Sequence, residues 1–285
     1  MDRKEYARRL RALIDAARDA DREATRVAQA SLRRAHGELL QEIAALPAEA
    51  STYSRYQLDQ LRRATERAME EFDRQLKASI NQELEAYWLS GREIVDRTLY
   101  DAVGAPPSLL DLNREQLRIA QDYSADLVTG LSNDARARLN ATLRRTALGG
   151  QSVTDIIGEI GRTVEGGQFG IISRRAETIY RTEVLRMSSM ATQARLEQAV
   201  GRGVAAKKMW VHAGVPARVR MYHLQINRQV VPVDEPFVNS GPNSPEDLMF
   251  PRDPAGSAQD TVNCGCGVFP WVDEFEKFRG LTSPA

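Results

Sequence analysis

Long apolar runs are missing from this sequence of 285 residues. A helix that crosses a membrane requires about 20 consecutive apolar residues, and no stretch approaches that length. The first five residues, Met1 to Glu5, carry charge where a secretory signal would need an apolar segment. We therefore expect a soluble protein that is made in a cytoplasm and has no membrane partner.

Aromatic residues are also scarce, at 6% of the sequence, whereas charged residues make up 27%. The hydrophobic content of 42% permits real cores, but this balance is typical of much solvated helical surface. The chain is long enough for two ordinary domains, since domains commonly contain roughly 100–150 residues. We expect an extended helical protein with one compact part.

Cysteine is nearly absent: the sequence has two, Cys264 and Cys266, separated by one residue. A disulfide across a single residue is strained, because the Cα atoms of bridged cysteines prefer a separation of about 5.5 Å. The two side chains are therefore predicted to be free thiols or metal ligands rather than a secretory disulfide.

What the sequence does contain is helical periodicity over most of its first hundred residues. One long helix is expected from Lys4 to about Leu46 and is ended by Pro47, and a second begins at a cap within residues 51–54. The short connection between them favours an antiparallel pair. Residues 1–103 are therefore predicted to form a long helical hairpin.

Glycine-rich breaks divide the middle of the chain, residues 104–170, into shorter helices. These helices are expected at about residues 113–129, 134–147 and 153–163. One more helix is expected at about residues 172–200.

After Gly203 the pattern changes from helix to strand. Short strands are predicted at 207–211, at 230–233 as an edge strand because of its proline, and at 268–269. So small a sheet must pack on the preceding helix. The fold class is therefore mostly α: a long-helix N-terminal region followed by a small α+β C-terminal domain, residues 171–285.

The C-terminal domain carries several motifs in a fixed order. The side chains that define them are Arg181, Thr182, Glu183, Trp210, Arg220, His223, Phe237, Asp253, Asn263, Cys264 and Cys266. This order resembles the C-terminal module of the phage Mu F-like family of minor head proteins, also called head morphogenesis proteins. Two positions depart from the family pattern: Ile226-Asn227-Arg228 replaces a turn that usually holds a glycine, and Gly265 replaces an arginine between the cysteines.

The resemblance implies a low-copy, non-enzymatic virion protein, found in the interior of a bacteriophage head or at its portal vertex and in the host cytoplasm during assembly. It implies the portal protein and the major capsid protein as partners, and some family members are linked to DNA delivery. The helical region would supply the assembly surface. We expect the C-terminal module to stay folded when that region is deleted.

Two interpretations are open for His223, Cys264 and Cys266. Imidazole and thiolate groups are favoured zinc ligands, and His212 or Asp253 could complete a tetrahedron. Alternatively, these residues only pack and hydrogen-bond, and no cofactor is required. Arg181 or Glu183 is expected to form a buried ion pair with the loop that follows Trp210.

Charge is unevenly distributed although the formal net charge is zero. Residues 171–230 hold eleven basic and three acidic residues, and residues 231–285 hold three basic and nine acidic residues. These two surfaces either pair with each other or leave a basic surface for double-stranded DNA. The candidate phosphate contacts are Lys207, Lys208, Arg218 and Arg220.

The alternative functions are a zinc-dependent hydrolase, a deaminase-like enzyme or a nucleic-acid-binding module. A deaminase requires His-x-Glu followed by Pro-Cys-x-x-Cys, whereas this chain has His223-Leu224-Gln225 and Cys264-Gly265-Cys266. The general acid is missing and the cysteine spacing differs. No phosphate-binding loop is present either, because Gly149-Gly150-Gln151-Ser152 lacks the lysine. The sequence therefore favours binding over catalysis.

Overall fold

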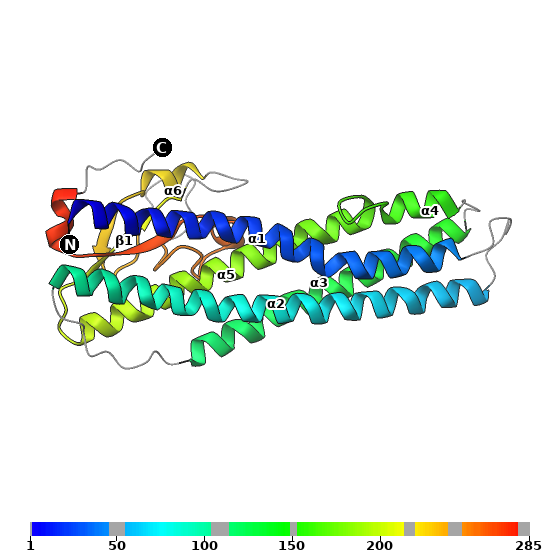
Figure 1. Ribbon diagram of the computed structural model, residues 1–285, viewed down its shortest axis with the longest axis horizontal. Helices are drawn as coiled ribbons and strands as arrows, with labels where there is room; N and C mark the ends of the chain where they lie inside the picture. Colours follow the sequence, from blue (N-terminus) through cyan, green and yellow to red (C-terminus); the bar gives the residue numbers. More distant parts are fainter. Residues whose placement is uncertain are drawn as a thin grey trace. The chain divides into compact units, whose positions relative to one another are not determined.

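The computed structural model describes residues 2–45, 55–103, 114–148, 153–213, 220–238 and 247–278. Its elements, in chain order, are α1 (Arg3–Ala44), α2 (Arg55–Val103), α3 (Glu115–Leu148), α4 (Val153–Ile160), α5 (Gly167–Gly201), β1 (Lys207–Val211), α6 (Met221–Gln225), β2 (Val230–Pro232), α7 (Ala258–Thr261), β3 (Gly267–Trp271) and the 3-10 helix η1 (Asp273–Phe278). Figure 1 shows them along the chain. The predicted fold class is confirmed: long helices come first, and a small sheet with short helices follows.

The described helices contain no segment that is both long and apolar enough to span a membrane.

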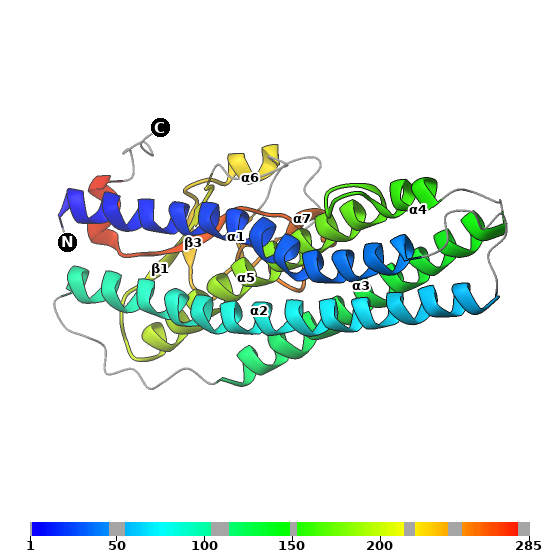
Figure 2. The ribbon, with the colours of Figure 1, turned by 45° about the vertical axis from the view of Figure 1, so that its right-hand side comes forward.

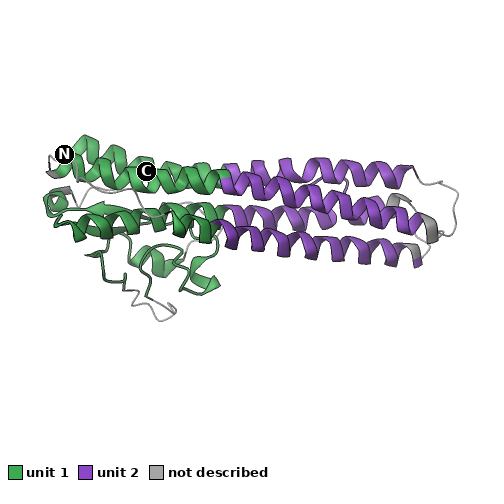
Figure 3. Ribbon diagram, turned by 90° about the horizontal axis from the view of Figure 1, so that it is seen from below, with its two compact units in different colours: residues 1–22, 82–120, 181–285 green, residues 23–81, 121–180 purple. Residues whose placement is uncertain are grey.

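The chain divides into two compact units, each built from segments distant in sequence (Figure 3). Unit 1 comprises residues 1–22, 82–120 and 181–285, and unit 2 comprises residues 23–81 and 121–180. Four long helices, α1, α2, α3 and α5, contribute residues to both units. The predicted division into residues 1–103, 104–170 and 171–285 concerns consecutive modules and stays a prediction.

In unit 2, α1 and α2 run antiparallel, as predicted for the two long helices. The guanidinium of Arg67 lies 3.2 Å from the carboxylate of Glu42, whereas Arg34, earlier in α1, lies 3.9 Å from Glu71, later in α2. The predicted cap within residues 51–54 and the predicted stop at Pro47 lie outside the described residues.

The prediction of two helices at 113–129 and 134–147 is wrong, because α3 is continuous through Gly130. A single glycine inside a helix costs only about 1 kcal/mol relative to alanine. Val128, Leu131 and Leu139 flank it and are almost completely buried. Their burial on one side of the helix outweighs the cost of the glycine.

Unit 1 contains the three-stranded antiparallel sheet, with strand order β2-β1-β3. All three predicted strands are confirmed, and β2, which holds Pro232, is an edge strand as expected. In the register of the sheet, Lys207 pairs with Pro232 on one side and with Trp271 on the other.

The first turns of α1 pack on this sheet, alongside β3 (Figure 2). The Tyr6 ring makes edge contacts with Phe269 and Trp271, at centroid distances of 5.7 and 6.2 Å, and lies 5.4 Å from Phe275. The sheet therefore shares its core with the N-terminus of the chain as well as with the preceding helix α5.

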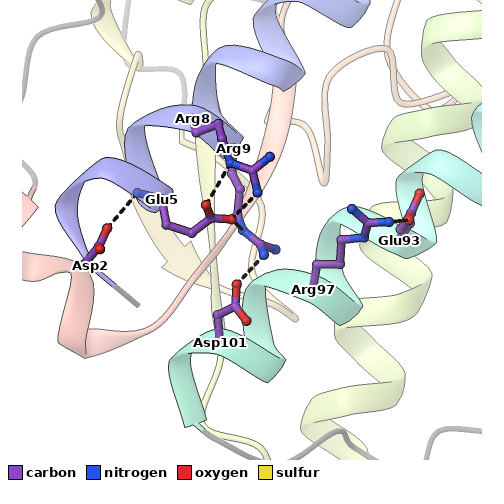
Figure 4. A network of polar contacts seen from close by, with 7 residues as sticks. All are labelled: Asp2, Glu5, Arg8, Arg9, Glu93, Arg97 and Asp101. Atoms are coloured by element: carbon purple, nitrogen blue, oxygen red, sulfur yellow. Dashed lines mark hydrogen bonds and ion pairs between the residues drawn. The ribbon is translucent and has the colours of Figure 1, made fainter.

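Polar contacts also fix the start of α1 in unit 1 (Figure 4). The Asp2 carboxylate accepts a hydrogen bond of 2.8 Å from the backbone N–H of Glu5, as a helix cap does. Arg9 forms an ion pair with Asp101 of α2. Because α1 begins at this point and α2 ends there, the two helices are antiparallel in unit 1 as well.

Candidate metal centre

His223, Cys264 and Cys266 come together in the interior of unit 1. The Nδ1 atom of His223 lies 3.6 Å from the Sγ atom of Cys264 and 3.8 Å from the Sγ atom of Cys266. Their candidate ligand atoms all lie within 4.8 Å of one another. The three side chains are at most 3% exposed. Neither Cys264 nor Cys266 is part of a disulfide, which agrees with the prediction of free thiols or metal ligands.

Two short segments carry these side chains, and Arg220 joins them. His223 lies on α6, a helix of five residues that follows Arg220 directly. The guanidinium of Arg220 donates to the carbonyl oxygens of Gln259 and Val262, at 2.7 and 2.6 Å. The histidine helix is thereby attached to the turn that leads into the cysteines.

Arg252 holds the cysteine segment from the other side. Its side chain is buried, and Nη1 donates to the carbonyl oxygens of Cys264 and Cys266, each at 2.6 Å. Nη2 donates to the carbonyl oxygen of Leu185 and to Oγ of Ser189, each at 2.8 Å. One guanidinium therefore connects both cysteines to helix α5.

The Arg181-Thr182-Glu183 signature holds the same segment against α5. Arg181 donates to the side-chain oxygen of Asn263 at 2.9 Å, and Thr182 Oγ1 accepts from the backbone N–H of Asn263 at 3.1 Å. Asn263 has a φ of 57°, a left-handed conformation that Asn tolerates better than most residues. The signature therefore fixes the residue that directly precedes Cys264.

Among the described residues, the ion pairs of Arg181 and Glu183 lie outside the loop after Trp210, where the sequence predicts one. Arg181 pairs with Asp21 of α1 at 2.5 Å, and Glu183 pairs with Arg186 one helical turn along α5. Helix α5 contacts the segment that holds Arg252 through hydrogen bonds, including one of 2.9 Å from Arg186 to the Arg252 carbonyl oxygen.

Trp210 and Phe237 form the apolar wall of the cluster. The Trp210 ring meets the His223 ring at a centroid distance of 5.1 Å and the Phe237 ring at 5.2 Å, both in edge-on geometry. Asp253 orders the adjacent turn, because its two oxygens accept hydrogen bonds from the backbone N–H groups of Met249 and Ala255 at 3.0 and 2.9 Å.

The two thiols have opposite electrostatic environments. Hydrogen bonds from Cys266 and then from His223, together with the nearby Arg252 guanidinium, hold the pKa of Cys264 well below its usual range. Burial, followed by the neighbouring Cys264, raises the pKa of Cys266 well above its usual range. Without a metal, the thiolate form is therefore favoured at Cys264 only.

His212 and Asp253, the predicted candidates for a fourth ligand, do not join the cluster. Among the described residues, the group of clustered donor side chains contains only His223, Cys264 and Cys266. Both oxygens of Asp253 already accept backbone hydrogen bonds.

The predicted phosphate contacts occupy different environments. Lys208 is completely buried, and its ammonium group donates to the Met249 carbonyl oxygen at 2.8 Å and to Gln193 at 3.2 Å. The prediction of a DNA contact at Lys208 is therefore wrong, because its charge does not reach the surface. Lys207 is half-buried and pairs with Asp273 at 2.7 Å, and Arg218 lies outside the described residues.

Sequence reasoning missed two residues that support the site, Arg252 and Arg186. Neither arginine is among the motif side chains that the sequence analysis identifies. One signal was available for Arg252: it lies in a loop that has few other side chains able to donate hydrogen bonds to buried carbonyl oxygens. The spacing of three between Glu183 and Arg186 was a second signal, because it places both on one helical face.

Comparisons with known proteins agree with the motif order. Residues 135–269 match the model of the family described as Phage Mu protein F like protein, which confirms the resemblance. The match begins within α3, upstream of the segment that carries the motifs.

Two relatives share parts of the chain. The uncharacterized protein YqbB of Bacillus subtilis (strain 168) is 39% identical over 109 residues, which are 38% of this chain and 33% of that protein. An NAD(+)--arginine ADP-ribosyltransferase, EFV, of Enterococcus faecalis (strain ATCC 700802 / V583) is 28% identical over 155 residues, 54% of this chain and 26% of that protein. The matched regions thus span about a third and a quarter of these relatives. No solved structure is significantly similar to the chain.

Proposed function

Because residues 135–269 belong to the Phage Mu protein F like family, we propose that the chain is a minor head protein of a tailed bacteriophage or prophage. It acts in head morphogenesis by binding, without turnover of a substrate. Its partners are the portal protein and the major capsid protein, and its site is the portal vertex or the head interior. It joins these partners in the host cytoplasm during assembly.

One observation of the structure carries this proposal: the motif side chains are engaged within the module itself. Arg181 and Thr182 bond to Asn263, and Arg252 bonds to the carbonyl oxygens of both cysteines. Side chains that bond to one another in a buried core stabilise a shape. A catalytic group needs access to a substrate instead. This use of the motif supports a structural role.

The packaged genome is a proposed neighbour rather than a specific ligand. Non-specific contact with double-stranded DNA requires exposed basic side chains and becomes weaker with added salt. Lys207, which is half-buried, meets that requirement only in part, and Asp273 competes for its charge. Any assistance in DNA packaging or delivery belongs to this accessory role.

The similarity to EFV suggests a second question, whether this chain also transfers ADP-ribose. The similar segment covers 26% of the enzyme, so most of the enzyme has no counterpart in the match. We propose that the shared segment is the binding module and that the transferase activity belongs to other parts of EFV.

The test is co-expression of the full chain with the portal and major capsid proteins of the same genetic element. Sedimentation and native mass spectrometry then show which assemblies contain it. We expect a defined, sub-stoichiometric amount bound to the portal or to procapsids, and each partner expressed alone identifies which of them recruits the chain.

Two results would contradict the proposal. A chain that stays free in every combination has no assembly role of this kind. ADP-ribosylation of an arginine acceptor by the purified chain in the presence of NAD+ would show that the chain is an enzyme.

A further inference from the structure

The side chains of His223, Cys264 and Cys266 converge in the interior of unit 1, with their candidate ligand atoms within 4.8 Å of one another. Two sulfur atoms approach the same Nδ1 atom of His223, at 3.6 and 3.8 Å. A metal ion shared by the three atoms would account for this convergence.

The geometry points to a zinc ion bound by His223 Nδ1, Cys264 Sγ and Cys266 Sγ in unit 1. Zinc binds sulfur at about 2.3 Å and nitrogen at about 2.0–2.1 Å with tetrahedral angles, which separates the nitrogen and sulfur ligands by about 3.6 Å. The nitrogen–sulfur distances in the structure, 3.6 and 3.8 Å, agree with this spacing.

Charge and ligand chemistry favour zinc over harder cations. Two thiolates and a neutral imidazole cancel the double charge of the ion, so a buried centre carries no net charge from these groups. Soft thiolate ligands select zinc over magnesium or calcium, which prefer oxygen. The burial of all three ligands therefore fits a metal with this ligand set.

The surrounding hydrogen bonds position the ligands in advance. Arg252 fixes the carbonyl groups of both cysteines, and Arg220 fixes the turn at residues 259–262 relative to the helix of His223. Positioning residues of this kind orient the ligands of metal sites. Neither arginine is a ligand, because a guanidinium has no free lone pair to donate.

His223, Cys264 and Cys266 supply three of the four ligands of a tetrahedral zinc site. The low exposure of these ligands closes the remaining position to a large substrate. The zinc is thus assigned a structural role, in which it joins α6 to the segment before β3. This inference does not depend on the proposed role in the phage head, and either one can fail alone.

The first experiment measures metal in the full chain purified without a histidine tag. We expect about one zinc per chain by elemental analysis. Replacement by Co²⁺ should give the intense visible absorption of a tetrahedral site and a thiolate-to-cobalt charge-transfer band. Zinc should also protect both cysteines from alkylation, and a strong chelator should remove the protection and lower the melting temperature.

Variants then assign the ligands. Cys264→Ser, Cys266→Ser and His223→Gln should each reduce bound metal to well under one per chain, and the charge-transfer band of the cobalt form should weaken with it. The matched control is His36→Gln, which replaces a buried histidine of unit 2 that bonds to the Gly161 carbonyl oxygen at 2.7 Å. This control should retain one zinc.

Several outcomes would overturn the site. The wild-type chain could hold well under one zinc even after incubation with zinc salts. Its cobalt spectrum could lack the sulfur band, or its cysteines could form a disulfide with each other. These three measurements use the wild-type chain and so stand even where a variant fails to fold. Equal zinc in folded ligand variants and in His36→Gln would place the metal elsewhere.

Discussion

Lys208 carries its ammonium group into the interior of unit 1. The charge lies between the carbonyl oxygen of Met249 and the side chain of Gln193, and 5.3 Å from the centre of the Phe237 ring. Burial lowers the pKa of Lys208 from 10.5 to about 8, although nearby acidic groups, of which Glu197 has the largest effect, raise it. The unfolded chain therefore binds this proton more tightly than the folded chain does.

This difference predicts a pH dependence of stability. Because the pKa of Lys208 is lower in the folded state, its contribution to the free energy of unfolding is complete above pH 10.5 and is lost as the pH falls through about 8. The free energy of unfolding of the wild type, relative to Lys208→Met, should therefore rise by about 1.5 kcal/mol between pH 8 and 9.5. Urea unfolding of both proteins at several pH values measures it.

The control for this titration is Lys207→Met, which replaces the adjacent lysine in sequence, one that is only half-buried. Its stability relative to the wild type should change little over the same range. If the free energies of unfolding of the wild type and Lys208→Met instead change in parallel with pH, burial does not lower the pKa of Lys208.

At the residue scale, the sequence indicated which side chains belong to the motif but not which of its lysines is buried. The motif side chains were identified because their order resembles a known pattern, and the order alone does not say what each of them contacts. The burial of Lys208 was not predictable, because a lysine beside a second lysine in a strand suggests a surface. Only the pairing of β1 with both β2 and β3 turns one of these two side chains inward.

Arg228 illustrates a departure from the pattern whose effect the structure specifies. It lies in the turn where the family usually has a glycine, and its φ is 72°. The turn thus keeps the left-handed conformation without the residue that favours it. The sequence indicated that this turn was unusual, but the dihedral angle came only from the structure.

At the element scale, close approach of α2 and α5 depends on Gly91. A Cβ atom at this position would collide with the Ser188 carbonyl oxygen and lie 2.8 Å from the Cβ atom of Ala191. Thr192 also donates a hydrogen bond of 3.1 Å to the Gly91 carbonyl oxygen. Both helices contact through backbone at this point, so little space remains for a side chain.

Alanine substitution should therefore act in opposite directions at two helical glycines. Gly91→Ala should destabilise the chain by about 1–3 kcal/mol, because backbone must move to accept the methyl group. Gly130→Ala, with nothing within 4 Å of its new methyl group, should stabilise it by up to about 1 kcal/mol. Chemical denaturation of both variants compares them, and destabilisation of both to the same extent would contradict the close-packing argument.

The helices themselves were largely predictable, and their interruptions were not. Periodic apolar residues located α1 and α2 within a few residues of their observed ends. The break predicted at Gly130 failed because sequence spacing does not reveal that Val128 and Leu131 are buried on either side. Tertiary packing decided the outcome at a position where local propensity was weak.

At the scale of the whole chain, the C-terminal sheet depends on residues from the other end of the sequence. One hydrophobic cluster in unit 1 combines side chains of α1 and α2 with those of the sheet, and its members include Tyr6, Leu10, Val95, Leu99, Phe269 and Trp271. Sequence analysis assigned the sheet to an independent module because its motifs are local. Long-range contacts of this kind leave no local motif.

The shared cluster leads to a new prediction, that the module does not stay folded without the helical region. A chain of residues 104–285 lacks Tyr6, Leu10, Val95 and Leu99, so one face of its sheet would be exposed to water. We expect it to aggregate, or to lose the near-ultraviolet circular dichroism of its buried tryptophans Trp210 and Trp271. In the full chain, Tyr6→Ala should cost about 3–5 kcal/mol, as for other buried aromatic residues.

Tyr100→Ala is the matched control, because Tyr100 lies on α2 but is 51% exposed, and its loss should change stability by less than about 0.5 kcal/mol. If the shortened chain instead keeps a cooperative unfolding transition and native aromatic circular dichroism, the sheet is self-sufficient. The contacts of Tyr6 would then be an addition to a module that folds without them. If the shortened chain instead fails to unfold cooperatively, recruitment experiments on heads must use the whole chain. A deletion that removes α1 and α2 would then also unfold the module that it leaves behind.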